Sequence, residues 1–135
     1  MRNQKIFVFL VLVLASGVCD AREGSGVSVD QLVFCREVRE RNPLEADTQF
    51  PDTVGRVFCH TRISADQPPT HISHVWYYQD VQMAVVDLAV NDSPWRTWSS
   101  KCIVPEWTGL WRVDVISKDG VVICSEQFFI TPAPN

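Results

Sequence analysis

The sequence predicts an all-β domain, an antiparallel sandwich of about seven strands of the immunoglobulin or fibronectin type. Two observations predict this fold. β-Branched and aromatic residues gather in seven short runs, and turn-forming residues separate the runs instead of interrupting them. A proline between strands removes no ladder hydrogen bond. The prolines that fall between the runs are Pro43, Pro51, Pro68, Pro69, Pro94 and Pro105.

The expected strands follow one another along most of the chain. They span residues 29–38, 55–63, 71–79, 81–90, 96–104, 109–117 and 121–131. Before the last strand, the sequence Lys118-Asp119-Gly120 predicts a short hairpin turn in which Gly120 takes a positive φ angle. A helix is conceivable only around residues 40–48, where Pro43 opposes it. Residues 29–131 are therefore expected to form one β-sandwich domain.

Alternation of side chains along a strand assigns their faces. In 109–117, one side carries Trp111, Val113 and Val115, which predicts the core face, and the other side carries Arg112 and Asp114.

In 71–79, Ile72, His74, Trp76 and Tyr78 share one side. A buried tryptophan on the third strand is common in such sandwiches, so Trp76 is expected in the core. His74 would then be buried as well and would need a hydrogen-bond partner. The alternative is that this side faces solvent and offers His74, Trp76 and Tyr78 to a ligand.

The N-terminal residues are typical of a secretory signal peptide. Arg2 and Lys5 precede the apolar run 6–14, and small residues follow, which predicts cleavage after Ala21. A competing interpretation is a lipid anchor at Cys19, although Val18 stands where a lipoprotein signal has a smaller residue. We therefore expect residues 1–21 to direct export to the periplasm or beyond, residues 22–28 to form a flexible lead-in, and residues 132–135 to form a tail. No transmembrane segment is expected in the mature chain.

The charge excludes two classes of partner. The chain has a formal net charge of −4, and removal of residues 1–21, which carry two positive charges and one negative charge, changes it to −5. Nucleic-acid binding depends on clustered Lys and Arg side chains that neutralise phosphates. Nucleic acid and anionic membrane surfaces are therefore not expected as partners.

The cysteines indicate an oxidising compartment. Once Cys19 is removed, the candidates for disulfide bonds are Cys35, Cys59, Cys102 and Cys124, an even number without a C-x-x-C spacing. Four thiols allow three pairings, and their spacing does not choose among them.

The stretch "WRTWSSK" at 95–101 combines aromatic and basic residues. On a strand, Trp95, Thr97, Ser99 and Lys101 face one way, whereas Arg96, Trp98 and Ser100 face the other. We expect Trp95 or Trp98 to pack in the core and the cations to cover ring faces at its rim.

Together with this stretch, four other segments resemble the bacterial domain-of-unknown-function family 2914. They are "FCREV" (34–38), "GRVFCHTRI" (55–63), "HISHVWYYQD" (71–80) and "WTGLWRVDVISKDGVVI" (107–123), so the resemblance extends over residues 30–131. It implies a compact β domain of envelope or exported proteins and no established activity. The family pattern includes cysteines resembling Cys35 and Cys59 but other residue types at Cys102 and Cys124. The resemblance therefore favours Cys35–Cys59 and Cys102–Cys124 as the disulfide pairs.

The sequence does not predict an enzyme, a cofactor or a metal site. His71 and His74 are three residues apart, which places them on opposite faces of a strand. Ser99 and Lys101 share a face, as a nucleophile and its base would, but no nucleophile elbow surrounds them.

We therefore expect a binding module for an envelope glycan, peptide or protein, because aromatic faces beside Arg and Asp suit such ligands. The alternative is a structural or assembly protein that pairs through an edge strand, and the least favoured function is an envelope hydrolase that depends on Lys101. In an immunoglobulin-like order the sixth strand lies beside the third, which would bring Arg112 and Asp114 alongside the third-strand side chains. The candidate binding residues are His74, Trp76, Tyr78, Trp95, Arg96, Lys101, Arg112 and Asp114.

Overall fold

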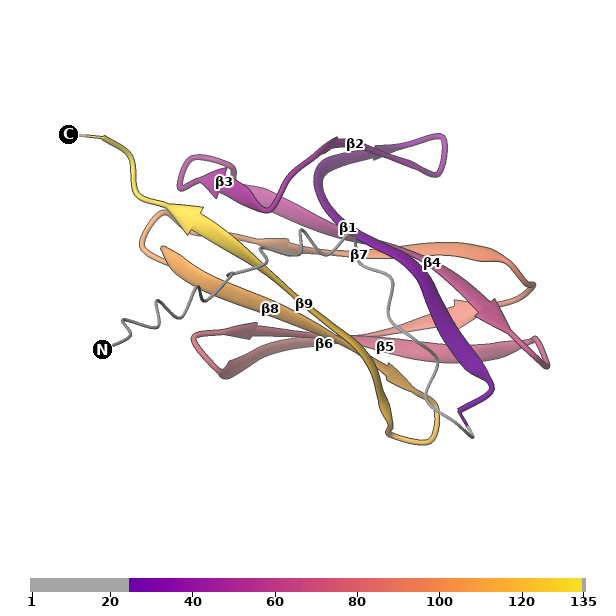
Figure 1. The fold of residues 1–135 in the computed structure, drawn as a ribbon. Coiled ribbons are helices and arrows are strands. Elements are labelled where there is room, and N and C mark those ends of the chain that lie inside the picture. The colour runs from indigo at the N-terminus through magenta and orange to yellow at the C-terminus, as the bar shows by residue number, and fades with distance from the viewer. Residues whose placement is uncertain (1–24, 135) are drawn as a thin grey trace, which may run out of the picture.

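The computed structural model describes residues 25–134, which form two β-sheets packed as a sandwich (Figure 1). The first sheet has the order β2-β1-β4-β7 and the second has the order β3-β9-β8-β5-β6. The strands of the first sheet are β1 (Val27–Arg39), β2 (Asn42–Ala46), β4 (Arg56–Ala65) and β7 (Trp95–Cys102). Those of the second sheet are β3 (Gln49–Pro51), β5 (Thr70–Tyr78), β6 (Val81–Val90), β8 (Gly109–Ser117) and β9 (Val122–Thr131).

The all-β sandwich is confirmed, and residues 25–134 form nine strands instead of about seven. The seven expected runs form β1, β4, β5, β6, β7, β8 and β9. The two additional strands, β2 and β3, are short; β2 lies in the region 40–48 where a helix was conceivable, and β3 follows it. β3 pairs parallel with β9, so the second sheet is mixed and not purely antiparallel. The third and sixth runs, β5 and β8, are neighbours as an immunoglobulin-like order requires.

Two hairpins turn through residues that rarely adopt the required backbone. Glu40 and Arg41 connect β1 to β2 with φ angles of 50° and 66°, and Gln79 and Asp80 connect β5 to β6 with φ angles of 46° and 65°. Positive φ at both central residues is the pattern of a type I′ two-residue loop, where Asn and Gly are preferred. Non-glycine residues there carry backbone strain. Gly120 has the positive φ angle, 83°, that its hairpin turn predicted.

Aromatic rings from both sheets form the centre of the core. Phe128 on β9 stacks on Trp111 at 5.9 Å and meets Trp76 edge-on at 6.1 Å, while Phe34 reaches it from β1 at 4.6 Å between ring centroids. Trp76 is fully buried, which confirms its expected core position. Trp111, Val113 and Val115 are also fully buried, as their alternation predicted.

β1 begins at Val27, two residues before the expected domain boundary, and β9 ends at the expected Thr131. The predicted signal peptide (1–21) and Cys19 lie outside the described residues. No helix within residues 25–134 is long and apolar enough to cross a membrane.

Replacement of the buried indole tests the core. Trp76→Ala is expected to lower the free energy of unfolding by about 3–5 kcal/mol, because it removes a large buried side chain and leaves a cavity. Urea denaturation of the purified domain measures this change. Val85, which is 53% exposed on β6, provides the control, since Val85→Ala should change stability by less than about 0.5 kcal/mol. Equal effects of the two variants would contradict the core assignment.

Candidate functional site

The predicted binding residues lie in several places and do not form one surface. His74 and Trp76 are fully buried, so the interpretation that they contact a surface ligand is wrong. Both lie on the inner side of β5 because the side that carries Ile72 packs against the first sheet. Tyr78, at the end of the same side, is half-buried.

A polar network lies inside the core and joins the two sheets. The Ser99 hydroxyl on β7 is 2.6 Å from Nδ1 of His74 and accepts a hydrogen bond from Nε1–H of Trp76 at 3.0 Å. On the other side of the imidazole, Nε2 lies 3.2 Å from Oγ1 of Thr61 on β4. The buried His74 was expected to need a hydrogen-bond partner, and each of its two ring nitrogens has one.

The hydrogen bonds fix the position of each proton in this network. The Thr61 hydroxyl donates to the carbonyl oxygen of Thr97 at 2.8 Å, so its Oγ1 can only accept from His74. His74 therefore carries its proton on Nε2, and its Nδ1 accepts the Ser99 O–H. Burial, together with the neighbouring His60, lowers the pKa of His74 from 6.5 to about 3. A charged imidazolium would also lose the acceptor that Ser99 needs.

Ser99 and His74 have the spacing of a nucleophile and a base but lack access to a substrate. Ser99 is 6% exposed and His74 is 0% exposed. The indole of Trp76 occupies the same serine oxygen. An imidazole with a pKa near 3 is a weak base at neutral pH. The pair therefore acts as a structural contact between the sheets.

Tyr78 and Lys101 belong to an aromatic cluster at the rim of the core. The Tyr78 hydroxyl donates to the carbonyl oxygen of Thr108 at 2.7 Å, and its ring lies 5.0 Å from Trp111 and 6.3 Å from Trp107. The Lys101 ammonium lies 5.0 Å above the Trp107 ring. Both side chains are thus engaged within the domain.

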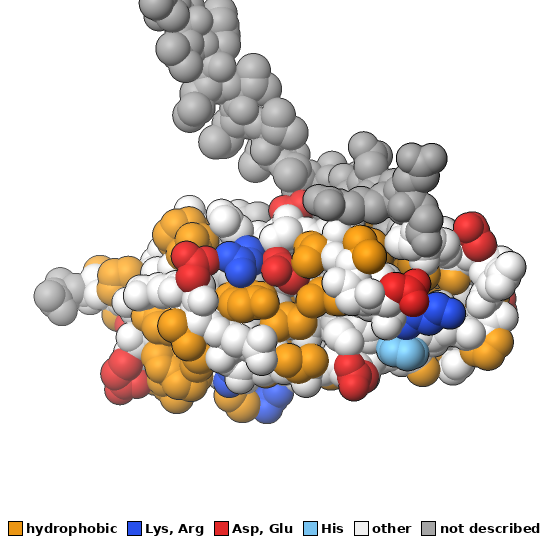
Figure 2. Space-filling view, turned by 90° about the horizontal axis from the view of Figure 1, so that it is seen from below, with side chains coloured by type: hydrophobic (Ala, Val, Ile, Leu, Met, Phe, Trp, Pro, Cys, Tyr) orange, Lys and Arg blue, Asp and Glu red, His pale blue; other side chains and the backbone are white. Residues whose placement is uncertain are grey.

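Arg112 and Asp114 lie on the outer face of the second sheet, where their charges are neutralised. Arg112 donates to Asp80 at 2.6 Å and to Asp114 at 3.1 Å, and its guanidinium lies 4.2 Å over the Tyr77 ring. Burial alone would lower the pKa of Arg112, but the contacts with Asp80 and Asp114 outweigh it and raise this pKa. Figure 2, a view from below, shows hydrophobic, acidic and basic side chains intermixed on one surface of the molecule.

The "WRTWSSK" strand places its two tryptophans differently. Trp95 packs against the core, and the guanidinium of Arg41 lies 4.9 Å above its ring. Trp98 faces outward and stacks on His60 at 5.8 Å with an interplanar angle of 9°. A cation over a ring at the rim is therefore confirmed for Trp95, but Arg41 supplies it and not Arg96 or Lys101.

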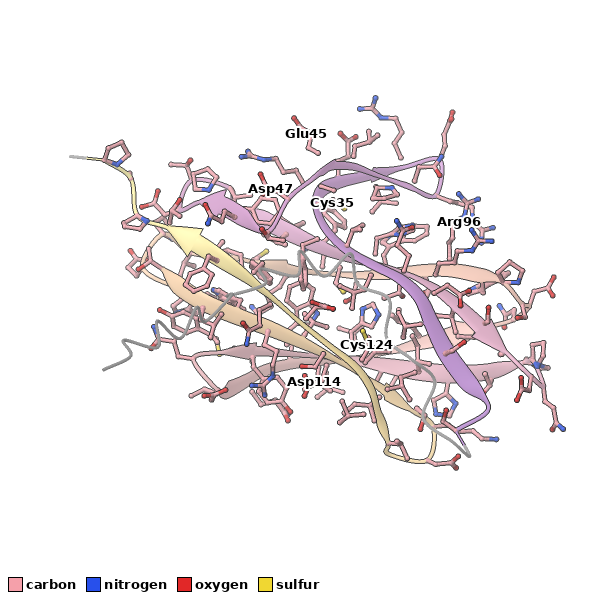
Figure 3. The ribbon with its side chains drawn as sticks, viewed as in Figure 1. Cys35, Glu45, Asp47, Arg96, Asp114 and Cys124 are labelled. Carbon is pink, nitrogen blue, oxygen red and sulfur yellow. The ribbon has the colours of Figure 1, made fainter. Side chains whose placement is uncertain are left out.

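One surface hollow brings cationic and aromatic side chains together. It has a volume of about 450 Å³, and we call it the arginine hollow. It lies where the β1–β2 turn meets β4, β7 and the loop before β7; Figure 3 shows Arg96 at this end of the first sheet. The residues that line it are Arg41, Arg62, Asp92, Pro94, Trp95 and Arg96.

The strand register and a strained turn bring the three guanidinium groups together. Arg62 and Arg96 are directly opposite each other on β4 and β7, so they share the outer face of the sheet. Arg41 comes from the β1–β2 turn, where its φ angle is 66°. Its carbonyl oxygen accepts a hydrogen bond of 2.9 Å from Nε2–H of His60. Burial is the main cause that lowers the pKa of His60, and the lowered pKa favours the neutral imidazole that donates this hydrogen bond.

The positive charge of the hollow is not neutralised by ion pairs. Within residues 25–134, neither Arg41, Arg62 nor Arg96 takes part in an ion pair. Arg96 donates to Oδ1 of Asn42 at 2.7 Å, which is a neutral partner. Among the described residues that line the hollow, Asp92 is the one carboxylate, and it accepts the backbone N–H of Ser93 at 2.8 Å. Three cations and one anion leave a net excess of two positive charges.

The disulfide pairs favoured by the family resemblance are wrong. Cys35, Cys59 and Cys102 have free thiols, and Cys124 is disulfide-bonded to none of these three. Cys35 is opposite Phe58 and Cys59 is opposite Phe34, so the two cysteines face opposite sides of the sheet and cannot be bridged. Burial raises the pKa of both thiols. Cys102 is exposed on β7, whereas Cys124 is buried on β9.

No group of three or more His, Cys, Asp or Glu side chains that could hold a metal ion occurs among residues 25–134. Sequence reasoning missed four residues of the hollow, the cations Arg41 and Arg62 together with Asp92 and Pro94. The signal for Arg62 was its outward position on the same strand as Cys59, but the identity of its neighbour required the β4–β7 register. Arg41 gave no signal, because only the turn conformation directs it to Trp95.

A model of one protein family matches part of the chain. The family is described as "Protein of unknown function (DUF2914)", and its model covers residues 69–130. The expected resemblance to DUF2914 is shown over this range. The match includes the hollow residues Asp92, Pro94, Trp95 and Arg96, whereas Arg41 and Arg62 precede it. The comparison with curated proteins gave no match.

The buried imidazole predicts that the domain loses stability in acid. Between pH 6.5 and about 3, His74 binds a proton in the unfolded chain but not in the folded one, so the free energy of unfolding should fall as pH decreases, by up to about 1.4 kcal/mol per pH unit. Urea denaturation at several pH values measures this slope. His74→Gln should reduce the slope, and His71→Gln, at an exposed position of the same strand, should retain it. An unchanged slope in His74→Gln would contradict the buried neutral state.

Proposed function

We propose that this protein is an exported, non-catalytic binding module that holds a component of the bacterial envelope, a glycan, peptide or protein, in the arginine hollow. The observation that carries the proposal is a surface hollow of about 450 Å³ in which three cationic side chains and one indole meet. Such a volume is within the range of ligand sites. Export is supported by the signal-peptide pattern of residues 1–21.

The position of the hollow on regular strands supports a binding role. Arg62 and Arg96 project from paired strands, which hold side chains more rigidly than loops do. Arg41 is supplied by a turn with a positive φ angle at two non-glycine residues. Backbone strain of this kind accumulates at functional sites.

The chemistry of the lining supports a role without catalysis. Among residues 25–134, no Ser, Cys or His side chain lines the hollow, and these are the usual nucleophiles and bases. Its single carboxylate already accepts a backbone hydrogen bond. Arginine and tryptophan are instead the residue types that contribute most often to binding energy.

Removal of one cation from the hollow should weaken envelope binding. In a pull-down, the mature protein is expected to bind purified envelope fragments of its source. Arg96→Gln should weaken this affinity roughly tenfold and so lower the bound fraction, because a hydrogen bond to a charged group is lost. Arg39→Gln is the matched control, since it removes the same charge from an exposed position of β1 that pairs with Glu37. Equal retention of the two variants would contradict the proposal.

The second candidate function is assembly through an edge strand, and β6 favours it. Within residues 25–134, β6 pairs only with β5, so its other edge is open. It has ten residues with no proline and a single charge, Asp87, and both Val81 and Val85 are exposed. Natural edge strands are commonly protected by lysine, proline or short length.

The same pull-down separates the two candidates. Val85→Lys places a charge on the open edge strand, where lysine opposes pairing with another chain. If the hollow binds the envelope, Val85→Lys should be retained like the unmodified protein, whereas Arg96→Gln should not. The reverse result, with loss of retention in Val85→Lys alone, would assign the interaction to β6.

A further inference from the structure

We infer that the arginine hollow is an oxyanion site that takes the phosphate or carboxylate group of an anionic sugar. This inference rests on the proposed function and adds the chemical class of the ligand. It also gives a role to an arrangement of charges that is otherwise unfavourable for folding.

Two like charges oppose each other at the hollow. Arg62 and Arg96 face each other across the β4–β7 ladder, and like charges in this position destabilise a sheet. Arg41 adds a third cation to the same hollow. On the opposite sheet the fold shows the alternative, because there Arg112 is placed between Asp80 and Asp114. Within residues 25–134, the arginines of the hollow have no such ion-pair partners, and a bound oxyanion would supply one.

Several hydrogen-bond donors of the three arginines remain available to a ligand. A guanidinium carries five N–H donors in a planar fork that matches phosphate and carboxylate oxygens. Arg96 donates from Nη1 to Asn42, and its other N–H groups remain available. The Arg41 guanidinium contacts the Trp95 ring with its planar face, so the N–H groups at its edge remain available. The Arg62 side chain makes no hydrogen bond to another residue between 25 and 134. Several charged donors can therefore reach one anion, and charge-assisted bonds of this type are among the strongest in proteins.

The apolar part of the lining favours an anionic group that is carried by a sugar. Pro94 and Trp95 form an apolar wall beside the three cations. A free inorganic anion has no apolar surface that could pack against this wall, whereas the C–H face of a sugar ring can. A volume of about 450 Å³ leaves room for a sugar unit in addition to its charged group.

His60 acts as a positioning residue in this site. Its Nε2–H holds the carbonyl oxygen of Arg41 at 2.9 Å, and its ring is stacked on Trp98. This hydrogen bond fixes the strained turn that directs Arg41 toward Trp95. The guanidinium is held before any ligand arrives, which reduces the entropy lost on binding.

Calorimetric titration of the mature protein at low ionic strength tests the inference. The probes are glucose 6-phosphate, galacturonic acid, glucose and inorganic phosphate. Glucose 6-phosphate and galacturonic acid are expected to bind, glucose is not, and inorganic phosphate should bind at least about tenfold more weakly than glucose 6-phosphate. Arg62→Gln should weaken the binding of glucose 6-phosphate about tenfold or more, because it removes a charged donor. Arg39→Gln should bind it like the unmodified protein.

Thermal unfolding gives an independent readout. Without any probe, Arg62→Gln should melt at the same temperature as the unmodified protein or higher, because it relieves the repulsion with Arg96. Glucose 6-phosphate should raise the melting temperature of the unmodified protein but not that of Arg62→Gln.

Three results would overturn the inference. The first is that glucose binds with the same affinity as glucose 6-phosphate. The second is that Arg62→Gln leaves the binding of anions unchanged. The third is that an acidic peptide such as tetraglutamate binds while both charged sugars fail to bind. Failure of all anionic probes together with an Arg96-dependent retention on envelope fragments would reject the oxyanion site but leave the proposed function standing.

Discussion

One buried hydroxyl group links the two sheets through their core. Ser99 on β7 contacts both His74 and Trp76 on β5, which belongs to the other sheet. These donors and acceptors are buried and need each other, so the loss of one would leave the others unsatisfied. The link therefore fixes which side of β7 faces inward. Because side chains alternate along a strand, the same constraint turns Arg96 and Trp98 outward.

This arrangement separates structure from binding. The inner polar groups, Thr61, His74 and Ser99, are buried, and His74 forms hydrogen bonds with both hydroxyls. The outer face of the same sheet carries the opposed pair Arg62 and Arg96, whose charges lack carboxylate partners within the described residues. Proteins tolerate such local conflicts mainly where function requires them. The conflict at the hollow is thus the feature that sets this surface apart from the rest of the domain.

Much of the fold could be predicted from the sequence because its signals are local. Runs of β-branched and aromatic residues predicted seven strands, and alternation predicted the burial of Trp111, Val113 and Val115. β2 and β3 were missed because a strand of three to five residues has no detectable periodicity.

The candidate site could be predicted only in part, since it depends on contacts between distant segments. Trp95 and Arg96 were identified from their composition, and both line the hollow. Arg112 and Asp114 looked like a binding pair, but Asp80, from a turn whose conformation the sequence does not reveal, completes their ion pairs. The cysteine pairing inferred from family resemblance failed because the register of β1 and β4 sets Cys35 and Cys59 on opposite faces.

The ring nitrogens of His74 give the most direct test of the link between the sheets. Nitrogen-15 chemical shifts of its imidazole report both the charge and the position of the proton. The account predicts a neutral ring at pH 5 with the proton on Nε2, because Ser99 supplies a donor to Nδ1 and Thr61 an acceptor to Nε2. Shifts that titrate near pH 6.5 would contradict the buried link between the sheets. A proton on Nδ1 would make His74 the donor to Ser99 and would contradict the predicted direction of this hydrogen bond.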